Sequence, residues 1–276
     1  MGVVKGLRST TVEAVAASKT PKPRGRAASI PLPGGLVETP YGEVWVERCH
    51  YPAETRQGAY VLRELAAVSE EARALLGVPD LGPHPAFLDT ETTGLARGAG
   101  TLAFLIGVGV WEGEALTLHL VFLQDPAQEA GALRYVADVL DQASGLVTFN
   151  GLGFDVPILE SRFILNRLPP RWSTLPHLDL LSTARSLWRD HLSSRRLIVL
   201  EDEILEIARD EEDVPSWMIP ALYRQYLAEG ETSEMARVFY HNRVDVLSLV
   251  SLLVHVARLV EAPESLAPAA AEWVGL

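Results

Sequence analysis

Cysteine and lysine are both scarce in this chain of 276 residues. The single cysteine, Cys49, excludes an internal disulfide framework and any zinc site built from several thiolates. The three lysines all lie within the first 22 residues, and the whole chain carries a net charge of −12. A net-acidic protein is poorly suited to coating nucleic acid broadly, because that requires many phosphates to be neutralised. An enzyme that binds a few phosphates through metal ions is not excluded.

Long apolar runs are also missing. The longest, Leu102 to Trp111, is about half the length that a membrane-spanning helix needs. No apolar signal segment lies within residues 1–30, so we expect a cytoplasmic protein with no membrane contact. Hydrophobic residues still make up 48% of the chain, which is enough for a sizeable core.

Composition divides the chain into four predicted parts. Residues 1–35 are rich in Ala, Ser, Pro and Gly and predict a flexible basic tail. Residues 36–83 predict an extension made of a strand pair and a helix over 61–77, because short alternating stretches precede helical spacing. Residues 84–262 predict the main domain, and 263–276 a C-terminal tail.

The main domain has the pattern of an α/β protein. Strands are predicted over 86–89, 101–111, 115–123 and 145–150, with helices over 127–142, 155–167, 178–190 and 233–260. Three successive strands, a helix, a fourth strand and then several helices indicate a mixed β-sheet flanked by helices. Strict strand–helix alternation and a glycine-rich phosphate loop, the marks of a dinucleotide-binding fold, are absent.

The first candidate site is Asp89-Thr90-Glu91-Thr92-Thr93-Gly94, at the end of a buried apolar strand. Because side chains alternate along a strand, Asp89 and Glu91 share one face and Thr90 lies on the other. Two neighbouring carboxylates repel each other unless a cation lies between them. The alternative is a solvated strand end followed by a turn.

The second candidate site runs from Asn150 to Asp155, after the strand over 145–150. Two glycines in this stretch allow a tight turn, and Asp155 falls in the first turn of the next predicted helix. A carboxylate is favoured there by the helix dipole even without a metal, so a capping role stays open.

The third candidate site, Tyr240-His241-Asn242-Arg243-Val244-Asp245, belongs to the predicted final helix. His241 and Asp245 are four residues apart and share a helical face. An imidazole beside a carboxylate can act as a general base, because its pKa lies near neutrality. A surface His–Asp pair is the alternative.

Together the three segments supply four carboxylates, one His and one Asn, each at the edge of an apolar element. Hard oxygen ligands favour Mg²⁺ or Mn²⁺ over zinc. Two such ions can orient a water and stabilise the entering and leaving oxygens at phosphorus. The predicted chemistry is phosphodiester hydrolysis.

The motif order resembles the DEDD superfamily of 3′–5′ exonucleases, which has the ribonuclease H-like fold, and most closely the bacterial YprB-type exonuclease-like proteins. The resemblance covers residues from Phe87 to about Leu259 and adds VFYHNRVDVLSL and PSWMIPALYRQYL to the first two motifs. It implies removal of nucleotides from the 3′ end of single-stranded DNA or RNA as 5′-monophosphates. Two ions would be held by Asp89, Glu91, Asp155 and Asp245, with Asp89 bridging both.

The third motif departs from the superfamily's patterns. One subgroup has Tyr four residues before the last Asp and another has His five before it; here His241 and Tyr240 are interchanged. We expect His241 to orient or deprotonate the attacking water, with Tyr240 as the fallback. An endonuclease using the same site, or a catalytically weak binding module serving a helicase or DNA repair partner, remains an alternative.

Substrate contacts are expected from Thr92, Asn150, Arg195 and Arg196. The arginines between 185 and 196 could line a path for phosphates or form a solvated basic face. The run from Glu201 to Asp213 contains eight acidic residues and one Arg, and predicts a solvated helix. Trp188 and Trp217 could stack on bases, but packing is the more common role of Trp.

Overall fold

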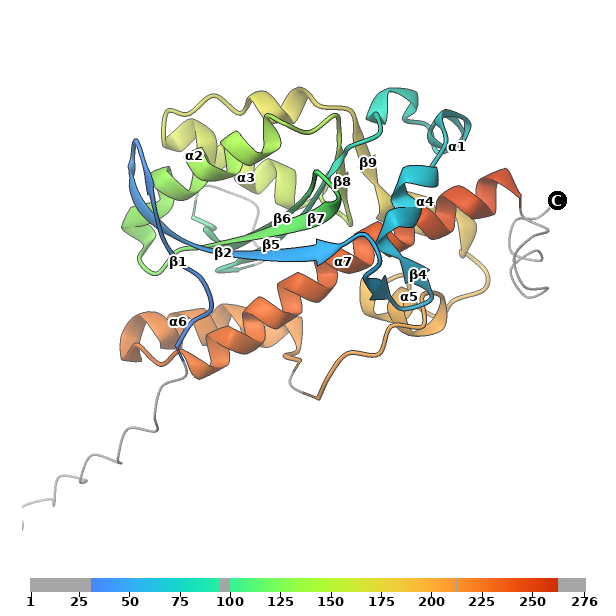
Figure 1. The fold of residues 1–276 in the computed structure, drawn as a ribbon. Helices are drawn as coiled ribbons and strands as arrows, with labels where there is room; N and C mark the ends of the chain where they lie inside the picture. Colours follow the sequence, from blue (N-terminus) through green and yellow to red (C-terminus); the bar gives the residue numbers. More distant parts are fainter. Residues whose placement is uncertain (1–30, 95–99, 212, 263–276) are drawn as a thin grey trace, which may run out of the picture.

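The computed structural model describes residues 31–94, 100–211 and 213–262 (Figure 1). The predicted C-terminal tail over 263–276 lies outside these ranges, as do residues 1–30 of the predicted tail over 1–35. The end of that tail was predicted wrongly: Leu32 is buried, the Pro33 carbonyl accepts a hydrogen bond of 2.8 Å from Trp45, and Gly35 begins β1. Within the described residues, no helix combines the length and apolarity that crossing a membrane requires. The strands are β1 (Gly35–Thr39), β2 (Gly42–Pro52), β3 (Arg56–Gln57), β4 (Tyr60–Val61), β5 (Ala86–Thr92), β6 (Ala103–Glu112), β7 (Ala115–Phe122), β8 (Leu146–Thr148) and β9 (His177–Asp179). The α-helices are α1 (Glu70–Leu75), α2 (Glu129–Leu140), α3 (Asp155–Leu165), α4 (Leu180–Leu187), α5 (Leu197–Glu203), α6 (Ile219–Glu229) and α7 (Ser233–Glu261).

A seven-stranded mixed sheet organises the fold, in the order β1-β2-β7-β6-β5-β8-β9. The strands from β1 to β5 in this order pair antiparallel, whereas β8 is parallel to both β5 and β9. β6 and β7 form a hairpin whose turn contains Gly113 at a φ of 60°, a left-handed conformation that suits glycine. The predicted mixed sheet with flanking helices is confirmed.

The N-terminal extension differs in part from the expectation. Its strand pair is present as β1 and β2, and β2 pairs with β7 from Trp45 to Pro52, so the hairpin widens the main sheet. The single helix predicted over 61–77 is wrong: a 3₁₀ helix over 62–67 and the short α1 occupy this stretch. Ser69 separates them, because its side chain accepts a hydrogen bond from the Ala72 amide and caps α1.

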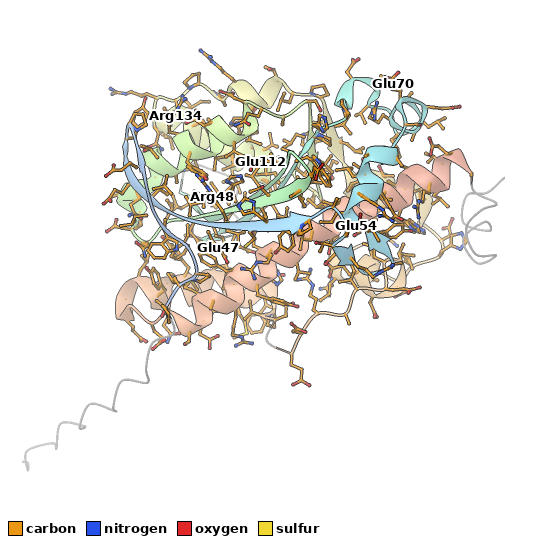
Figure 2. All side chains as sticks on the ribbon, viewed as in Figure 1. Glu47, Arg48, Glu54, Glu70, Glu112 and Arg134 are labelled. Carbon is orange, nitrogen blue, oxygen red and sulfur yellow. The ribbon has the colours of Figure 1, made fainter. Side chains whose placement is uncertain are left out.

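Helices cover both faces of the sheet (Figure 1). α2 packs on one face, over β1, β2 and β6, and α7 crosses the other face beneath β5 and β6. Glu47 and Arg48 are neighbours on β2 and lie on opposite sides of it in Figure 2, as strand alternation requires. Glu47 accepts hydrogen bonds of 2.8 Å from Arg243 of α7, and Arg48 donates one of 2.8 Å to Tyr135 of α2. These contacts tie each helix layer to the sheet.

Glycines on β6 let α7 approach the sheet closely. A Cβ on Gly107 would lie 2.1 Å from Asn242 Oδ1 and 2.9 Å from Val246 Cγ2. Gly107 is paired with Asp89 on β5, so the space it leaves is filled by Asn242 directly beside Asp89. The close approach therefore sets the depth at which the middle of α7 meets the end of β5.

Candidate metal centre and active site

The end of β5 presents its polar side chains to two different helices. Asp89 accepts a hydrogen bond of 2.6 Å from Asn242 of α7, and Glu91 Oε1 lies 3.9 Å from His241 Nε2 of the same helix. Thr90 donates a hydrogen bond of 2.5 Å to Asp155 of α3. This is the predicted alternation, with both strand carboxylates facing α7.

Asp155 is the first residue of α3, as expected, and is buried. The turn before it is held by Asp179, the N-cap of α4, which accepts hydrogen bonds from the amides of Asn150 (2.7 Å) and Leu152 (3.1 Å). Gly151 is needed in this turn because a Cβ there would lie 2.4 Å from Thr148 Oγ1. The turn thus fixes the start of α3, and with it the carboxylate of Asp155, against β5.

His241 and Asp245 share a face of α7, as predicted, with His241 Nε2 3.5 Å from Asp245 Oδ2. Together with Glu91 they offer ligand atoms that all lie within 4.8 Å of one another, a group that could hold a metal ion. Asp89 joins this group through its hydrogen bond with Asn242, which lies three residues before Asp245 on α7. The first and third motifs, more than 140 residues apart, therefore meet in one site.

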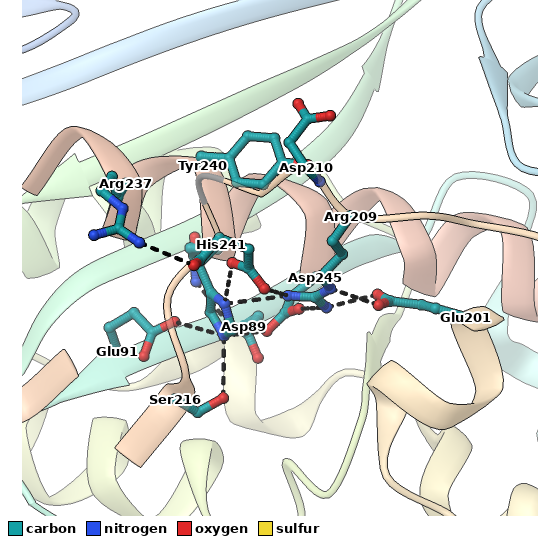
Figure 3. Close-up of polar contacts among 12 residues, drawn as sticks. Asp89, Glu91, Glu201, Arg209, Asp210, Ser216, Arg237, Tyr240, His241 and Asp245 are labelled. Atoms are coloured by element: carbon teal, nitrogen blue, oxygen red, sulfur yellow. Dashed lines mark hydrogen bonds and ion pairs between the residues drawn. The ribbon is translucent and has the colours of Figure 1, made fainter. Parts of the chain in front are cut away.

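His241 is held from both of its ring nitrogens (Figure 3). Nδ1 lies 2.7 Å from the Asp213 carboxylate and Nε2 lies 3.2 Å from Ser216 Oγ. Arg209 Nη1 is also 3.1 Å from Nδ1, but a nitrogen that donates to Asp213 cannot accept from Arg209, and the shorter carboxylate contact decides. Asp213 therefore fixes the tautomer in which the Nε2 lone pair points toward Glu91 and Asp245.

Arg209 brings a positive charge into the cluster. Its guanidinium donates two hydrogen bonds, of 2.6 and 2.7 Å, to Glu201 and also bonds Asp245 and Asp213. Burial alone would lower the pKa of Arg209, but the hydrogen bonds that it donates to Glu201 and the charge of Asp245 raise the pKa overall, so the group stays charged. The solvated helix predicted for Glu201–Asp213 is wrong: α5 ends at Glu203, and Glu201 is fully buried.

Arg209 does not fully offset the burial and mutual repulsion that raise the pKa values of the strand carboxyl groups. Burial raises the pKa of Asp89 well above its usual range, and the charges of Asp245 and Asp155 raise it further. The pKa of Glu91 is raised by the same causes in the same order. Burial raises the pKa of Asp155 to about 6, against the opposing hydrogen bond from Thr90. Carboxylates that resist ionisation when left together are the donor set that a divalent cation stabilises.

The remaining predicted residues lie apart from this cluster or beside it. Thr92 is buried and donates to the Gly94 carbonyl, and Asn150 is exposed with a left-handed φ of 67°. Arg195 donates to the Leu192 carbonyl, and Arg196 is exposed at the start of α5. Among the described residues, no hydrogen bond or ion pair links either arginine to the carboxylates. The Tyr240 hydroxyl accepts a hydrogen bond of 2.9 Å from the Asp210 amide.

Several residues of the site were not found from the sequence. Asn242 belongs to the third motif, and its place next to His241 on the predicted helix was the signal in the sequence that could have marked it as part of the site. Asp179 and Asp213 had no motif around them, and Arg209 was a lone base in an acidic run. The position of this one base among eight acidic residues was the only hint in the sequence that some of that run pairs internally.

Comparisons with known proteins agree with the resemblance drawn from the motifs. Residues 86–257 match the RNase H superfamily. Over 223 residues the chain is 34% identical to YprB of Bacillus subtilis (strain 168), covering 78% of this chain and 53% of that protein. The chain therefore spans about half the length of this relative. A solved structure of exonuclease I is similar over 64% of this chain and 42% of its own, at 17% identity and a TM-score of 0.42, a likeness too slight to carry an argument.

Proposed function

Because the chain belongs to the RNase H superfamily, we propose that it is a metal-dependent 3′–5′ exonuclease acting on single-stranded DNA or RNA. The products are nucleoside 5′-monophosphates. The observation that carries the proposal is the meeting of Glu91, His241 and Asp245, with ligand atoms within 4.8 Å of one another, beside Asp89. The direction of cleavage and the single-stranded substrate rest on the resemblance of the three motifs.

The four carboxylates are the proposed ligands of Mg²⁺ or Mn²⁺. Asp89, Glu91, Asp155 and Asp245 would together hold two such ions. When bound, such ions supply a lowered pKa for water and positive charge beside the entering and leaving oxygens. The chain's contribution is to hold the carboxylates in place: Asn242 orients Asp89, and Thr90 orients Asp155.

His241 is the proposed general base. With Nδ1 donating to Asp213, Nε2 carries the lone pair, which accepts from the Ser216 hydroxyl in this structure. In the proposed reaction the attacking water takes the place of that hydroxyl and gives its proton to Nε2, on the side of Glu91 and Asp245. The imidazolium that forms is stabilised by the Asp213 carboxylate. Tyr240 is less suited to this role, since its hydroxyl contacts the Asp210 amide away from the carboxylates.

Substrate contacts are proposed for Thr92 and Asn150 at the ends of β5 and β8, and for Arg195 and Arg196 before α5. Phosphate contacts through arginine orient a strand without reading its sequence.

A second candidate function is a nucleic-acid-binding module with weak catalysis. Arg209 favours it, because its guanidinium bonds Asp245 and offers a positive charge where a ligand of the metal is needed. If Arg209 keeps this contact when metal is present, the Asp245 carboxylate is not fully available to bind the ions.

The test uses 5′-labelled single strands of DNA and RNA with Mg²⁺, Mn²⁺ or EDTA. The wild type is compared with Asp89→Asn and with Asp141→Asn, an exposed carboxylate at the end of α2 that serves as the matched control. The exonuclease gives a shrinking ladder that needs metal, spares a circular strand and disappears only in Asp89→Asn. Cleavage of the circle indicates an endonuclease. Binding without products from any strand indicates the weak module and contradicts the proposal.

A further inference from the structure

Trp217 is 80% exposed, although tryptophan is a residue that folding usually buries. Trp172 and Trp188, by contrast, are 2% and 0% exposed and belong to the core. The packing role expected for Trp188 is thus confirmed, and the one expected for Trp217 is wrong. An indole left in water contributes little to the stability of the fold, so its position calls for another explanation.

The position of Trp217 is next to the proposed general base. It follows Ser216, whose Oγ lies 3.2 Å from His241 Nε2, and both belong to a 3₁₀ turn over 216–218 (Figure 3). His241 is buried, whereas Ser216 is exposed. The turn therefore lies between the imidazole of the proposed general base and solvent.

The backbone that carries Trp217 is anchored on both sides. Val214 before it is 1% exposed and Ile219 after it is 0% exposed. The Met218 amide donates a hydrogen bond of 2.8 Å to the Pro215 carbonyl and closes the turn. The backbone at Trp217 is thus held in place, so a ligand that contacts the indole does not have to order a loop first.

We propose that Trp217 is a substrate-positioning residue whose indole stacks on a base of the single strand while the neighbouring phosphate lies at the carboxylates. The inference rests on the proposed function and adds a reason why the enzyme would prefer single strands to duplexes. An unpaired base has a free face to stack, whereas a base inside a duplex is already stacked. Because every base has such a face, Trp217 selects single strands without selecting sequence.

Binding is the direct test, measured with fluorescein-labelled DNA and RNA strands, Mg²⁺ and protein that carries Glu91→Gln to prevent cleavage. On this background, Trp217→Ala raises the Kd roughly tenfold or more, and Trp217→Phe, which keeps an aromatic face, restores most of the affinity. The matched control is Tyr41→Ala, an aromatic residue that is 52% exposed in the β1–β2 turn, and its Kd is unchanged.

A strand with abasic nucleotides at its 3′ end separates stacking from a structural effect. Protein with Trp217 binds it as weakly as the Trp217→Ala variant binds the intact strand, and the variant itself does not distinguish the two strands. If the Trp217→Ala variant and the protein with Trp217 bind the intact strand with equal Kd values, the stacking role is overturned and the nuclease proposal stands. Failure to bind any strand, with all variants folded, overturns the proposed function together with this inference.

Discussion

Replacing Asp155 by Asn is expected to remove a pH dependence of stability that the metal-free protein shows. The pKa of Asp155 rises from 3.8 to about 6 on folding, chiefly through burial. At about 1.4 kcal/mol for each pKa unit, this rise corresponds to about 3 kcal/mol. As pH increases from 4 to 7, the unfolded chain loses this proton first. The folded state must then either keep the proton or ionise a buried carboxylate, so it loses stability.

The assay is urea unfolding in EDTA between pH 4 and 7, comparing the wild type with Asp155→Asn. We expect the stability of the wild type, relative to the variant, to fall by about 2.4 kcal/mol as pH rises through this window, since part of the full effect is already lost at pH 4. Asp141→Asn, which changes an exposed carboxylate outside the site, is the matched control. A wild-type-minus-Asp155→Asn difference that stays flat, or that grows in favour of the wild type, would refute the account of this carboxylate.

Three further substitutions test the surroundings of the site. Asp213→Asn should lower kcat by roughly 10- to 100-fold, because the charge that orients the imidazole is lost, and single-turnover cleavage measures it. Gly107→Ala should cost about 1–3 kcal/mol in urea unfolding and also reduce cleavage, because its Cβ would meet Asn242 at 2.1 Å. Arg209→Gln should destabilise the fold by about 3–5 kcal/mol, since it leaves Glu201 buried and unpaired, and a double change with Glu201→Gln should recover much of this loss.

Each of these expectations has a result that contradicts it. An unchanged kcat in Asp213→Asn means that the imidazole does not depend on that carboxylate. Gly107→Ala is compared with Gly35→Ala, where a Cβ meets nothing within 4 Å, and equal stability of the two excludes the close approach of α7. If the double variant at Arg209 and Glu201 is no more stable than Arg209→Gln alone, the buried pair is not the source of the loss.

The parts of the site that short motifs describe could be predicted from the sequence. Asp89 and Glu91 follow from strand alternation, and His241 and Asp245 from helical spacing, because both depend on residues close in the chain. The strands of the main domain also followed in outline, since their apolar segments are long and clearly separated. The sequence did not predict that β2 widens the main sheet by pairing with β7. Alternation of apolar and polar residues marks a strand but does not specify its partner.

The parts that depend on distant pairing could not be predicted. The acidic run ending at Asp213 has the composition of a solvated helix, yet one buried guanidinium gathers Glu201, Asp213 and Asp245 around it. Trp217 shows the reverse case: average burial places tryptophan inside, whereas the short turn that anchors its neighbours leaves the indole in solvent. In both, tertiary contacts override what composition favours.

The most direct test of the central claim is to identify the first product released from a single strand labelled at its 3′ end. We predict that wild-type protein with Mg²⁺ or Mn²⁺ releases the label at once as a nucleoside 5′-monophosphate, and that Asp89→Asn, shown to be folded by its thermal unfolding, releases none. Labelled oligonucleotides as first products, or equal release by the variant, would contradict the claim that this carboxylate cluster removes nucleotides from a 3′ end.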